Sequence, residues 1–347
     1  MRIISNPHRA GPKLAPTAPY PSDDAARVGT LLRQCPAAHE TPLVQPAGLA
    51  PVAKVWVKDE RARMNLGSFK ALGAAYVIAR HAEEVSSTPD TSTLQGRTYV
   101  TASAGNHGMS VAAGARVFGA DAVVYIADTV PEGFADRLKA QKAKVVRAGA
   151  NYAASMEAAM QAAEGNGWVL LSDSSWEGYV DLPLVLMEGY LQMAAEAVAQ
   201  CPEPPTHIFL QAGVGGLAGA VATYARKIWG DAPRIVVVEP DAAPALQASI
   251  EAGKSVFADG PDSIMGRLDC KEPSLIALNG LGRDADDFLT LSDDEVTEYL
   301  PQLACHGLAT TASGGSGAVA ILREDVRAVL GMGSDARALC FLSEAVE

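Results

Sequence analysis

Residues 98–126 read TYVTASAGNHGMSVAAGARVFGADAVVYI, and this stretch decides the fold class. Residues 99–102 and 122–126 are short apolar runs typical of strands, and residues 106–118 between them have the length and composition of a helix. A strand, a helix and a strand in this order predict two parallel strands joined by a crossover helix. The pattern continues with helices expected over 131–141 and 152–164 and strands over 144–147 and 168–171. The sequence therefore predicts an α/β fold with a mostly parallel sheet.

A second series of elements follows residue 206, with strands expected over 207–211, 234–239 and 338–342 and a helix over 217–229. A single long helix is expected over 183–199, between the two series. Before the first series, residues 53–60 alternate like a strand. Open parallel sheets bind ligands at the carboxyl ends of their strands, so motifs at those ends are the candidates for a functional site.

The composition argues against several classes of protein. The net charge of −12 over 347 residues disfavours a nucleic-acid partner, which needs a basic face. The five cysteines are scattered and form no CxxC pair, so a disulfide framework or a structural metal site is not expected. The amino-terminal residues lack the apolar stretch of a signal peptide, and no run is long enough to span a bilayer. We therefore expect a cytoplasmic protein without a metal ion or membrane association.

The stretch Asn65-Leu-Gly-Ser-Phe-Lys-Ala-Leu-Gly73 places a lysine at the start of an expected helix. Ser68 is a good helix cap, which puts Lys70 in the first turn. The positive pole of the helix disfavours an ammonium group there, and burial would also favour the neutral amine. A neutral amine can attack a carbonyl and form a Schiff base. The alternative is a solvated surface lysine, since lysine is seldom buried.

Two further motifs lie where an expected strand meets a helix. In Ser103-Ala-Gly-Asn-His-Gly108, Asn106 is either a ligand-binding amide or a helix cap. Gln211-Ala-Gly-Val-Gly-Gly-Leu-Ala-Gly219 offers a glycine loop and a helix amino terminus, which together suit a phosphate. The same loop also fits a dinucleotide fingerprint, with Glu239 at the end of the next strand as the acid that would bind a ribose.

These motifs, in this order, resemble those of fold-type II pyridoxal-phosphate-dependent enzymes, the tryptophan-synthase-β-like family. The resemblance runs from about residue 40 to the carboxyl terminus. Four strings are more narrowly similar to the diaminopropionate ammonia-lyases. They are Lys58-Asp-Glu60, Asp173-Ser-Ser-Trp-Glu-Gly-Tyr179, Gln211-Ala-Gly-Val-Gly215 and Ser313-Gly-Gly-Ser-Gly-Ala318.

The resemblance implies a cofactor, pyridoxal 5'-phosphate, in a cleft between two doubly wound domains. We expect residues 1–68 and 190–347 to form the large cofactor-binding domain and residues 69–189 the small domain. The resemblance implies that Lys70 holds the cofactor as a Schiff base and later abstracts the substrate's α-proton. The expected cofactor-binding residues are Lys70, Asn106, Gly213, Val214, Gly215, Gly216, Leu217 and Ser343, with Asn106 at the phenolic oxygen, residues 213–217 at the phosphate and Ser343 at the pyridine nitrogen.

Two positions bear on the substrate. Asp173 ends an expected strand at the ligand edge, where it would contact or protonate a leaving group; the alternative is a helix cap. Ala104 stands where the resembled family has an aspartate, which is proposed there to take the α-proton of the D-substrate. Alanine has no titratable group, so we expect this chain to prefer the single configuration, the L-isomer, that presents its α-proton to Lys70.

The leading hypothesis is a lyase that eliminates a β-substituent from a small 3-substituted L-amino acid, with 2,3-diaminopropionate the first choice and a 2-oxo acid and ammonia the products. Within the class, the alternatives are a serine/threonine or hydroxyaspartate dehydratase and a β-replacement synthase. From other classes, an NAD-dependent oxidoreductase that uses residues 213–239 and a non-catalytic cofactor-binding protein stay open. We expect the protein to be a homodimer and its substrate to be a small amino acid.

Overall fold

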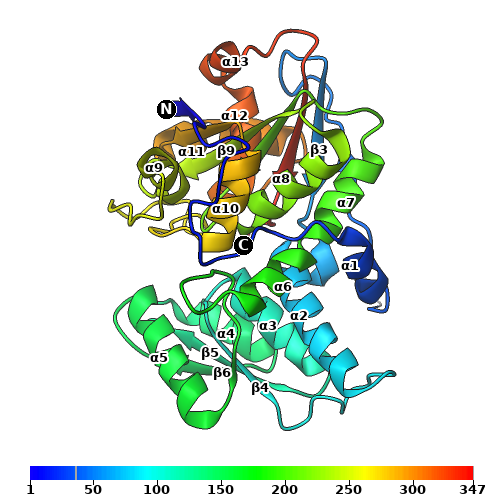
Figure 1. The fold of residues 1–347 in the computed structure, drawn as a ribbon, viewed down its shortest axis with the longest axis vertical. Helices are drawn as coiled ribbons and strands as arrows, with labels where there is room; N and C mark the ends of the chain where they lie inside the picture. The colour runs from blue at the N-terminus through cyan, green and yellow to red at the C-terminus, as the bar shows by residue number, and fades with distance from the viewer. Residues whose placement is uncertain (36, 347) are drawn as a thin grey trace.

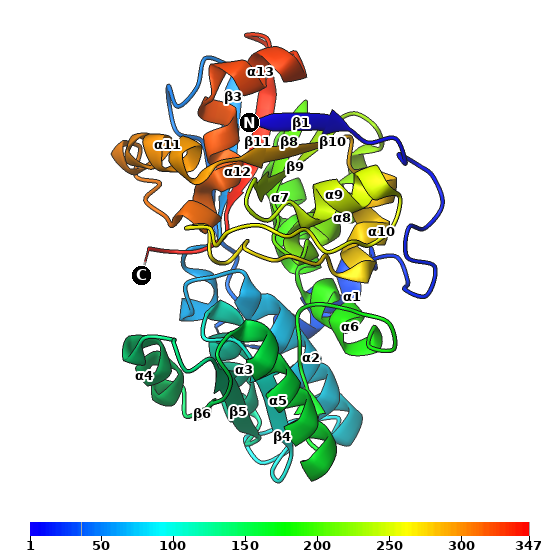
Figure 2. The same cartoon turned by 90° about the vertical axis from the view of Figure 1, so that its left-hand side faces the viewer.

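The computed structural model describes residues 1–35 and 37–346, which form two β-sheets (Figure 1 and Figure 2). The large sheet has the strand order β1-β10-β9-β8-β11-β3-β2, and the small sheet has the order β6-β5-β4-β7. The strands of the large sheet are β1 (Arg2–Ser5), β2 (Leu43–Val44), β3 (Lys54–Asp59), β8 (His207–Gln211), β9 (Arg234–Pro240), β10 (Asp287–Leu291) and β11 (Arg337–Leu342). Those of the small sheet are β4 (Thr98–Ala102), β5 (Asp121–Ile126), β6 (Lys144–Arg147) and β7 (Val169–Leu170).

The helices alternate with these strands along the chain. They are α1 (Ala25–Leu32), η1 (Arg63–Asn65), α2 (Lys70–Val85), α3 (Asn106–Val117), α4 (Glu132–Ala140), α5 (Tyr152–Asn166), α6 (Asp181–Gly189), α7 (Leu191–Gln200), α8 (Gly216–Trp229), α9 (Ala245–Ala252), α10 (Leu275–Asp284), α11 (Asp293–Cys305), α12 (Ala312–Leu322) and α13 (Glu324–Leu330). In the described part, no helix is both long and apolar enough to cross a bilayer.

Both sheets are mostly parallel, as the sequence predicted. The small sheet is parallel throughout, and only the edge strands β1 and β2 of the large sheet run antiparallel to their neighbours. Parallel strands need crossover connections, which the intervening helices supply. Strand β11 is the last in the chain but lies between β8 and β3 inside the sheet. The predicted α/β class is therefore confirmed.

Helices cover both faces of the large sheet, because successive side chains of a strand point to opposite faces. On β8, Ile208 and Leu210 share a core cluster with α8 and α10, whereas Phe209 belongs to the cluster formed with α11 and α12. The small sheet is arranged in the same way, with α2 and α3 on one face and α5 on the other. This layering brings the carboxyl ends of both sets of strands toward the middle of the molecule (Figure 1).

The expected single helix over 183–199 is wrong, because it breaks at Tyr190 into α6 and α7. Residue Gly189, the last of α6, lies directly against α2. A Cβ atom there would come within 2.6 Å of the Leu72 carbonyl oxygen, so only glycine permits this contact. The chain turns at this point of close approach, and Tyr190 enters the core between α2 and α8.

Candidate active site

Lys70 is the first residue of α2. Backbone hydrogen bonds join the residues just before it to the carboxyl-terminal segment, and we call this pairing the bridge. Phe69 N–H donates to the Ser343 carbonyl at 3.1 Å, and Ala345 N–H donates to the Gly67 carbonyl at 2.9 Å. The helix cap is Phe69 rather than the expected Ser68, although the Ser68 hydroxyl still accepts the Lys70 N–H at 3.3 Å. The bridge places Lys70 next to Ser343, 273 positions away in the printed sequence.

The Lys70 amine forms an ion pair with the Asp173 carboxylate. Both side chains are largely buried, with 20% and 16% of their surface exposed. Burial alone would lower the pKa of Lys70, but the nearby Asp173 charge outweighs it and raises this pKa above its ordinary value. Burial raises the pKa of Asp173, and the Lys70 charge more than reverses this effect, so that the pKa is lowered. The ion pair with Asp173 thus favours the ammonium form of Lys70, whereas the helix terminus and burial were expected to favour the neutral amine.

Asp173 does not cap a helix. The chain after it forms a bridge between Trp176 and Tyr179, and α6 begins only at Asp181, with Val180 as its cap. The carboxylate instead faces the amine at the start of α2. The structure thus excludes the alternative role that the sequence left open for this residue.

Asn106 and His107 begin α3 at the carboxyl end of β4. Gly105 is the helix cap, and the Asn106 amide donates to the Glu344 carboxylate, so Asn106 is not the capping residue. The buried His107 ring bonds the Leu171 carbonyl through Nε2 at 2.8 Å. A carbonyl only accepts, so Nε2 carries the proton, and burial lowers the pKa of this ring. His107 therefore fixes the loop as a neutral structural residue.

Glu344 connects the two halves of the site, and the sequence reasoning missed it. Its carboxylate accepts from Asn106 and from the Thr311 hydroxyl, and it pairs with Arg267 Nε at 3.3 Å. The residue is 4% exposed. The sequence signal that could have found it is an acidic residue two positions after the expected strand over 338–342. The carboxylate therefore ties α3 of the small sheet to α12 and to the loop before α10.

Ser343 is 5% exposed, and none of the described residues bonds its hydroxyl. The Tyr190 hydroxyl is in a similar state: the side chain is 1% exposed and the oxygen has no partner among the described residues. The Tyr190 ring packs on Phe69 with the ring centres 4.9 Å apart, and it lies under Gly216. Two hydroxyl groups near the start of α2, the buried one of Tyr190 and that of Ser343, are thus available to a ligand.

The glycine loop forms the amino terminus of α8, as predicted. Gly215 caps the helix with a φ of 98°, which glycine adopts without strain. The first N–H groups of a helix have no partner within it, so those of Gly216 and Leu217 can bind an anion. Cys270 lies against this loop and accepts the Val214 N–H. Its burial raises the pKa of the thiol to about 12, so Cys270 is a neutral thiol.

The dinucleotide interpretation of this loop fails at Glu239. That carboxylate is fully buried and accepts the N–H groups of Leu246 and Gln247 at 2.7 and 2.8 Å. Both oxygens therefore serve as the cap of α9. No ribose hydroxyl can reach them without unfolding the start of this helix.

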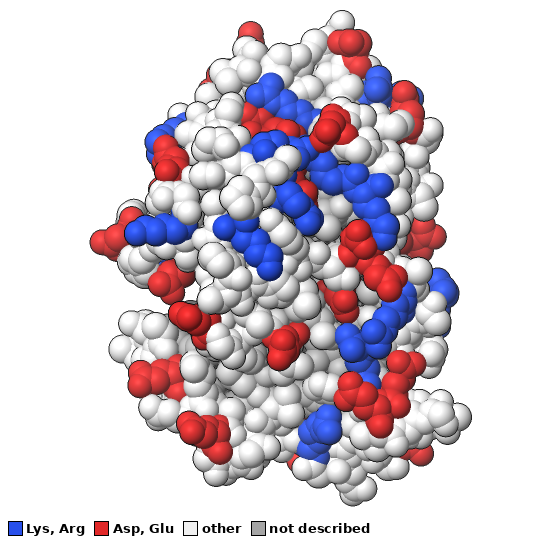
Figure 3. Space-filling view, in the orientation of Figure 1, with Lys and Arg blue, Asp and Glu red and all other residues white. Residues whose placement is uncertain are grey.

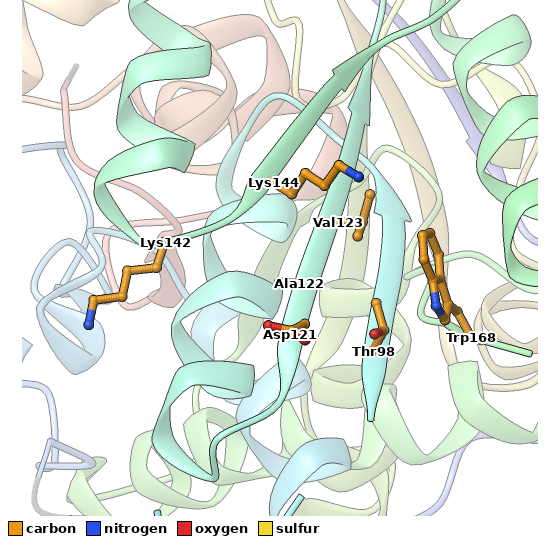
Figure 4. Close-up of a pocket in the computed structure, with 7 residues that line it drawn as sticks. All are labelled: Thr98, Asp121, Ala122, Val123, Lys142, Lys144 and Trp168. Carbon is orange, nitrogen blue, oxygen red and sulfur yellow. The ribbon is translucent and has the colours of Figure 1, made fainter. Parts of the chain in front are cut away.

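A cavity of about 330 Å³ lies at the amino-terminal ends of the small-sheet strands, away from Lys70 (Figure 4). Its ammonium groups, on Lys142 and Lys144, point in different directions and do not converge on one ligand. On the face drawn in Figure 3, basic and acidic side chains are intermixed. The residues around Lys70 therefore remain the candidate site.

Known proteins resemble this chain over most of its length. A family model described as "Pyridoxal-phosphate dependent enzyme" matches residues 35–344. Diaminopropionate ammonia-lyase of Escherichia coli (strain K12) is 34% identical over 295 residues, which are 80% of this chain and 74% of that protein. A probable D-serine dehydratase of Ectopseudomonas mendocina (strain ymp) is 24% identical over 273 residues, 72% of this chain and 61% of that protein.

Solved structures agree with these relatives. The crystal structure of Escherichia coli diaminopropionate ammonia-lyase in complex with an aminoacrylate-PLP azomethine reaction intermediate has a TM-score of 0.86 at 30% identity, covering 99% of this chain and 93% of that one. The processed form of threonine deaminase isoform 2 from Solanum lycopersicum has a TM-score of 0.81 at 20% identity, covering 100% and 94%. The second likeness concerns the fold alone.

Proposed function

The chain belongs to the family of pyridoxal-phosphate-dependent enzymes, and from this premise we propose that it is a lyase that eliminates a β-substituent from a small 3-substituted amino acid. The first-choice substrate is 2,3-diaminopropionate, with a 2-oxo acid and ammonia as products. The observation that carries the proposal is the pairing of Lys70 with Asp173 at the carboxyl ends of the strands, beside an anion-binding helix terminus.

The residues present fit the cofactor. The unpartnered N–H groups at the start of α8 suit its phosphate, and the free hydroxyl of Ser343 suits its ring nitrogen as a neutral partner. The Asn106 amide, at the start of α3, donates to Glu344, the residue after Ser343, and from there it would bind the phenolic oxygen. We propose Lys70, Asn106, residues 213–217 and Ser343 as the cofactor-binding set.

When bound, pyridoxal phosphate supplies an electron sink for bonds broken at the substrate's α-carbon. Lys70 would hold the cofactor and take the α-proton. Asp173 is ionised beside it, so it would bind a cationic 3-ammonium group, which leaves as neutral ammonia without a further proton. An uncharged 3-amino group would need a proton, which Asp173 could pass on only after taking it from Lys70. The two side chains thus serve the two bonds that a β-elimination breaks.

A screen of 3-substituted alanines tests this function. We expect the purified protein to be yellow. It should release a 2-oxo acid fastest from 2,3-diaminopropionate and more slowly from serine, threonine and hydroxyaspartate. With an added thiol, we expect no β-replacement product. Faster release from serine or hydroxyaspartate would identify a dehydratase, as the D-serine dehydratase relatives suggest. Colourless protein that yields no 2-oxo acid from any of them would refute the lyase.

The alanine at position 104 leads us to predict a preference for one enantiomer of the substrate. It lies partly buried on the core before Asn106, and its methyl group cannot accept a proton. Lys70 can serve only one face of a planar ligand, so we expect one enantiomer of 2,3-diaminopropionate, the L-isomer, to react at least about 10²-fold faster than the other. Separate assays of both enantiomers measure the ratio. An Ala104→Asp variant should gain D-isomer turnover, whereas comparable wild-type rates would require a second base elsewhere, Asp173 first.

We also propose the domain boundaries given by the sequence, a large domain of residues 1–68 and 190–347 and a small one of 69–189. The composition of the two sheets supports this division, since β4 to β7 lie between residues 98 and 170. A cytoplasmic location and a homodimer are further proposals. Light scattering should find twice the mass of one chain, and a single-chain mass would rule out the dimer.

A further inference from the structure

A cluster of four charged side chains lies buried just before the Lys70 segment. It consists of Lys58, Glu60, Arg63 and Glu196, and we call it the charge cluster. Lys58, Glu60 and Arg63 are fully buried, and Glu196 is 6% exposed. Two cations and two anions cancel, so the cluster has no net charge. Burial opposes ionisation of Glu196, but Arg63 and Lys58 lower its pKa to about 2, which keeps it charged.

Arg63 is the centre of the charge cluster. Its Nε donates to Glu60 Oε2 at 2.7 Å, and its two terminal nitrogens reach both oxygens of Glu196 at 2.9 and 2.6 Å. They also donate to the His39 carbonyl and to the Thr41 hydroxyl, each at 2.9 Å. Only the planar fork of an arginine can serve two carboxylates in this way. The guanidinium is thus clamped between the end of β3 and helix α7.

The residues that follow Arg63 adopt a conformation that their side chains disfavour. Met64 and Asn65 have φ values of 51° and 58°, in the left-handed region, and Gly67 has a φ of 76°. Two adjacent non-glycine residues in this region persist only where the surroundings hold them. Beyond them, the bridge to residues 343–345 fixes Gly67 and Phe69. The segment between β3 and α2 is therefore clamped at both of its ends.

We infer that Arg63, clamped between Glu60 and Glu196, is a positioning residue that sets the path of residues 64–69 and hence the place of Lys70. The inference rests on the proposed role of Lys70 in catalysis. Buried ion pairs add little stability compared with apolar packing of the same volume, so stability alone is a poor account of four buried charges. The charge cluster supplies a fixed geometry instead. Through Glu196, helix α7 holds Arg63, which lies seven residues before Lys70.

The test compares Arg63→Lys with Arg226→Lys. Arg226 is a matched control, because it is also mostly buried and pairs with Asp286 at 2.5 Å, but Asp286 precedes β10, near the opposite edge of the large sheet from β3. Both variants keep the charge and lose the guanidinium fork. Hydrogen exchange of the Leu66 and Phe69 amides, which are bonded to the Arg63 and Ser343 carbonyls, reports on the segment. We expect at least about tenfold faster exchange in Arg63→Lys and none of this increase in Arg226→Lys.

The second readout is kinetic. A displaced Lys70 should lower kcat by on the order of 10²-fold with little change in KM, and it should lower the fraction of cofactor that borohydride fixes to Lys70. Should Arg63→Lys not fold, Thr41→Val removes one link of the clamp, the hydroxyl 2.9 Å from Arg63, and should show the same pattern more weakly. Equal exchange at residues 66 and 69 in the Arg63 and Arg226 variants, with unchanged kcat, would overturn the inference. The exchange result stands apart from substrate identity, so it is distinguishable from failure of the proposed lyase.

Discussion

Replacement of Lys70 by alanine is expected to lower kcat by at least about 10³-fold, because the variant loses the amine that we propose both holds the cofactor and takes the α-proton. The fold should survive. Lys70 makes one ion pair, and its removal leaves the largely buried Asp173 carboxylate without its partner, which costs on the order of 3 kcal/mol. We therefore expect a folded protein with a lowered thermal midpoint and almost no turnover.

Borohydride reduction followed by peptide mapping measures this directly. In the wild-type protein the cofactor should be fixed on the peptide that contains Lys70, and in Lys70→Ala no peptide should carry it. Lys144→Ala is a suitable control, because Lys144 lines the cavity at the other end of the small sheet. A label found on a different lysine would show that the reactive amine has been misassigned.

Asp173→Asn is expected to have the second largest effect, at least about 10²-fold on kcat for 2,3-diaminopropionate. The amide keeps the size of the side chain but cannot hold a cationic leaving group as a carboxylate does. It also removes the charge that raises the pKa of Lys70, so the free amine should react faster with an acylating reagent near neutral pH. That second effect can be measured without substrate.

A substrate whose leaving group carries no positive charge separates the two roles of Asp173, which are to hold a cationic leaving group and to raise the pKa of Lys70. Chloride leaves 3-chloroalanine as an anion, so Asp173→Asn should lose little activity on this substrate. Equal losses on 3-chloroalanine and 2,3-diaminopropionate would contradict a role at the leaving group and point to Lys70 alone. Wild-type rates on both would remove Asp173 from the mechanism.

The sequence was most informative where structure is local. The strand and helix alternation, the glycine loop and the lysine at a helix start all depend on near neighbours, and the structure contains each of them. The α/β class and the cofactor family follow from these local patterns. The predicted roles of Asn106 and Ser343 await the experiments, although both side chains lie at the expected edge of their sheets.

Long-range contacts explain what the sequence could not show. The charge that raises the pKa of Lys70 is on Asp173, 103 positions away, and Asn106 donates to Glu344 across 238 positions. The break between α6 and α7 lies beside Gly189, where the chain packs closely against α2. The cap of α2 is Phe69, whose N–H is bonded to the carbonyl of Ser343 in the bridge.

The position of β11 has a consequence for how the protein is made. The strands of the small sheet are synthesised within one uninterrupted stretch, whereas β3 has only the short edge strand β2 as a sheet neighbour until residues 337–342 emerge from the ribosome. The bridge that fixes Phe69 uses residues that are translated later still. The small sheet can therefore assemble on the nascent chain, but Lys70 acquires its final place only after residues 343–345 have been synthesised and have left the ribosome.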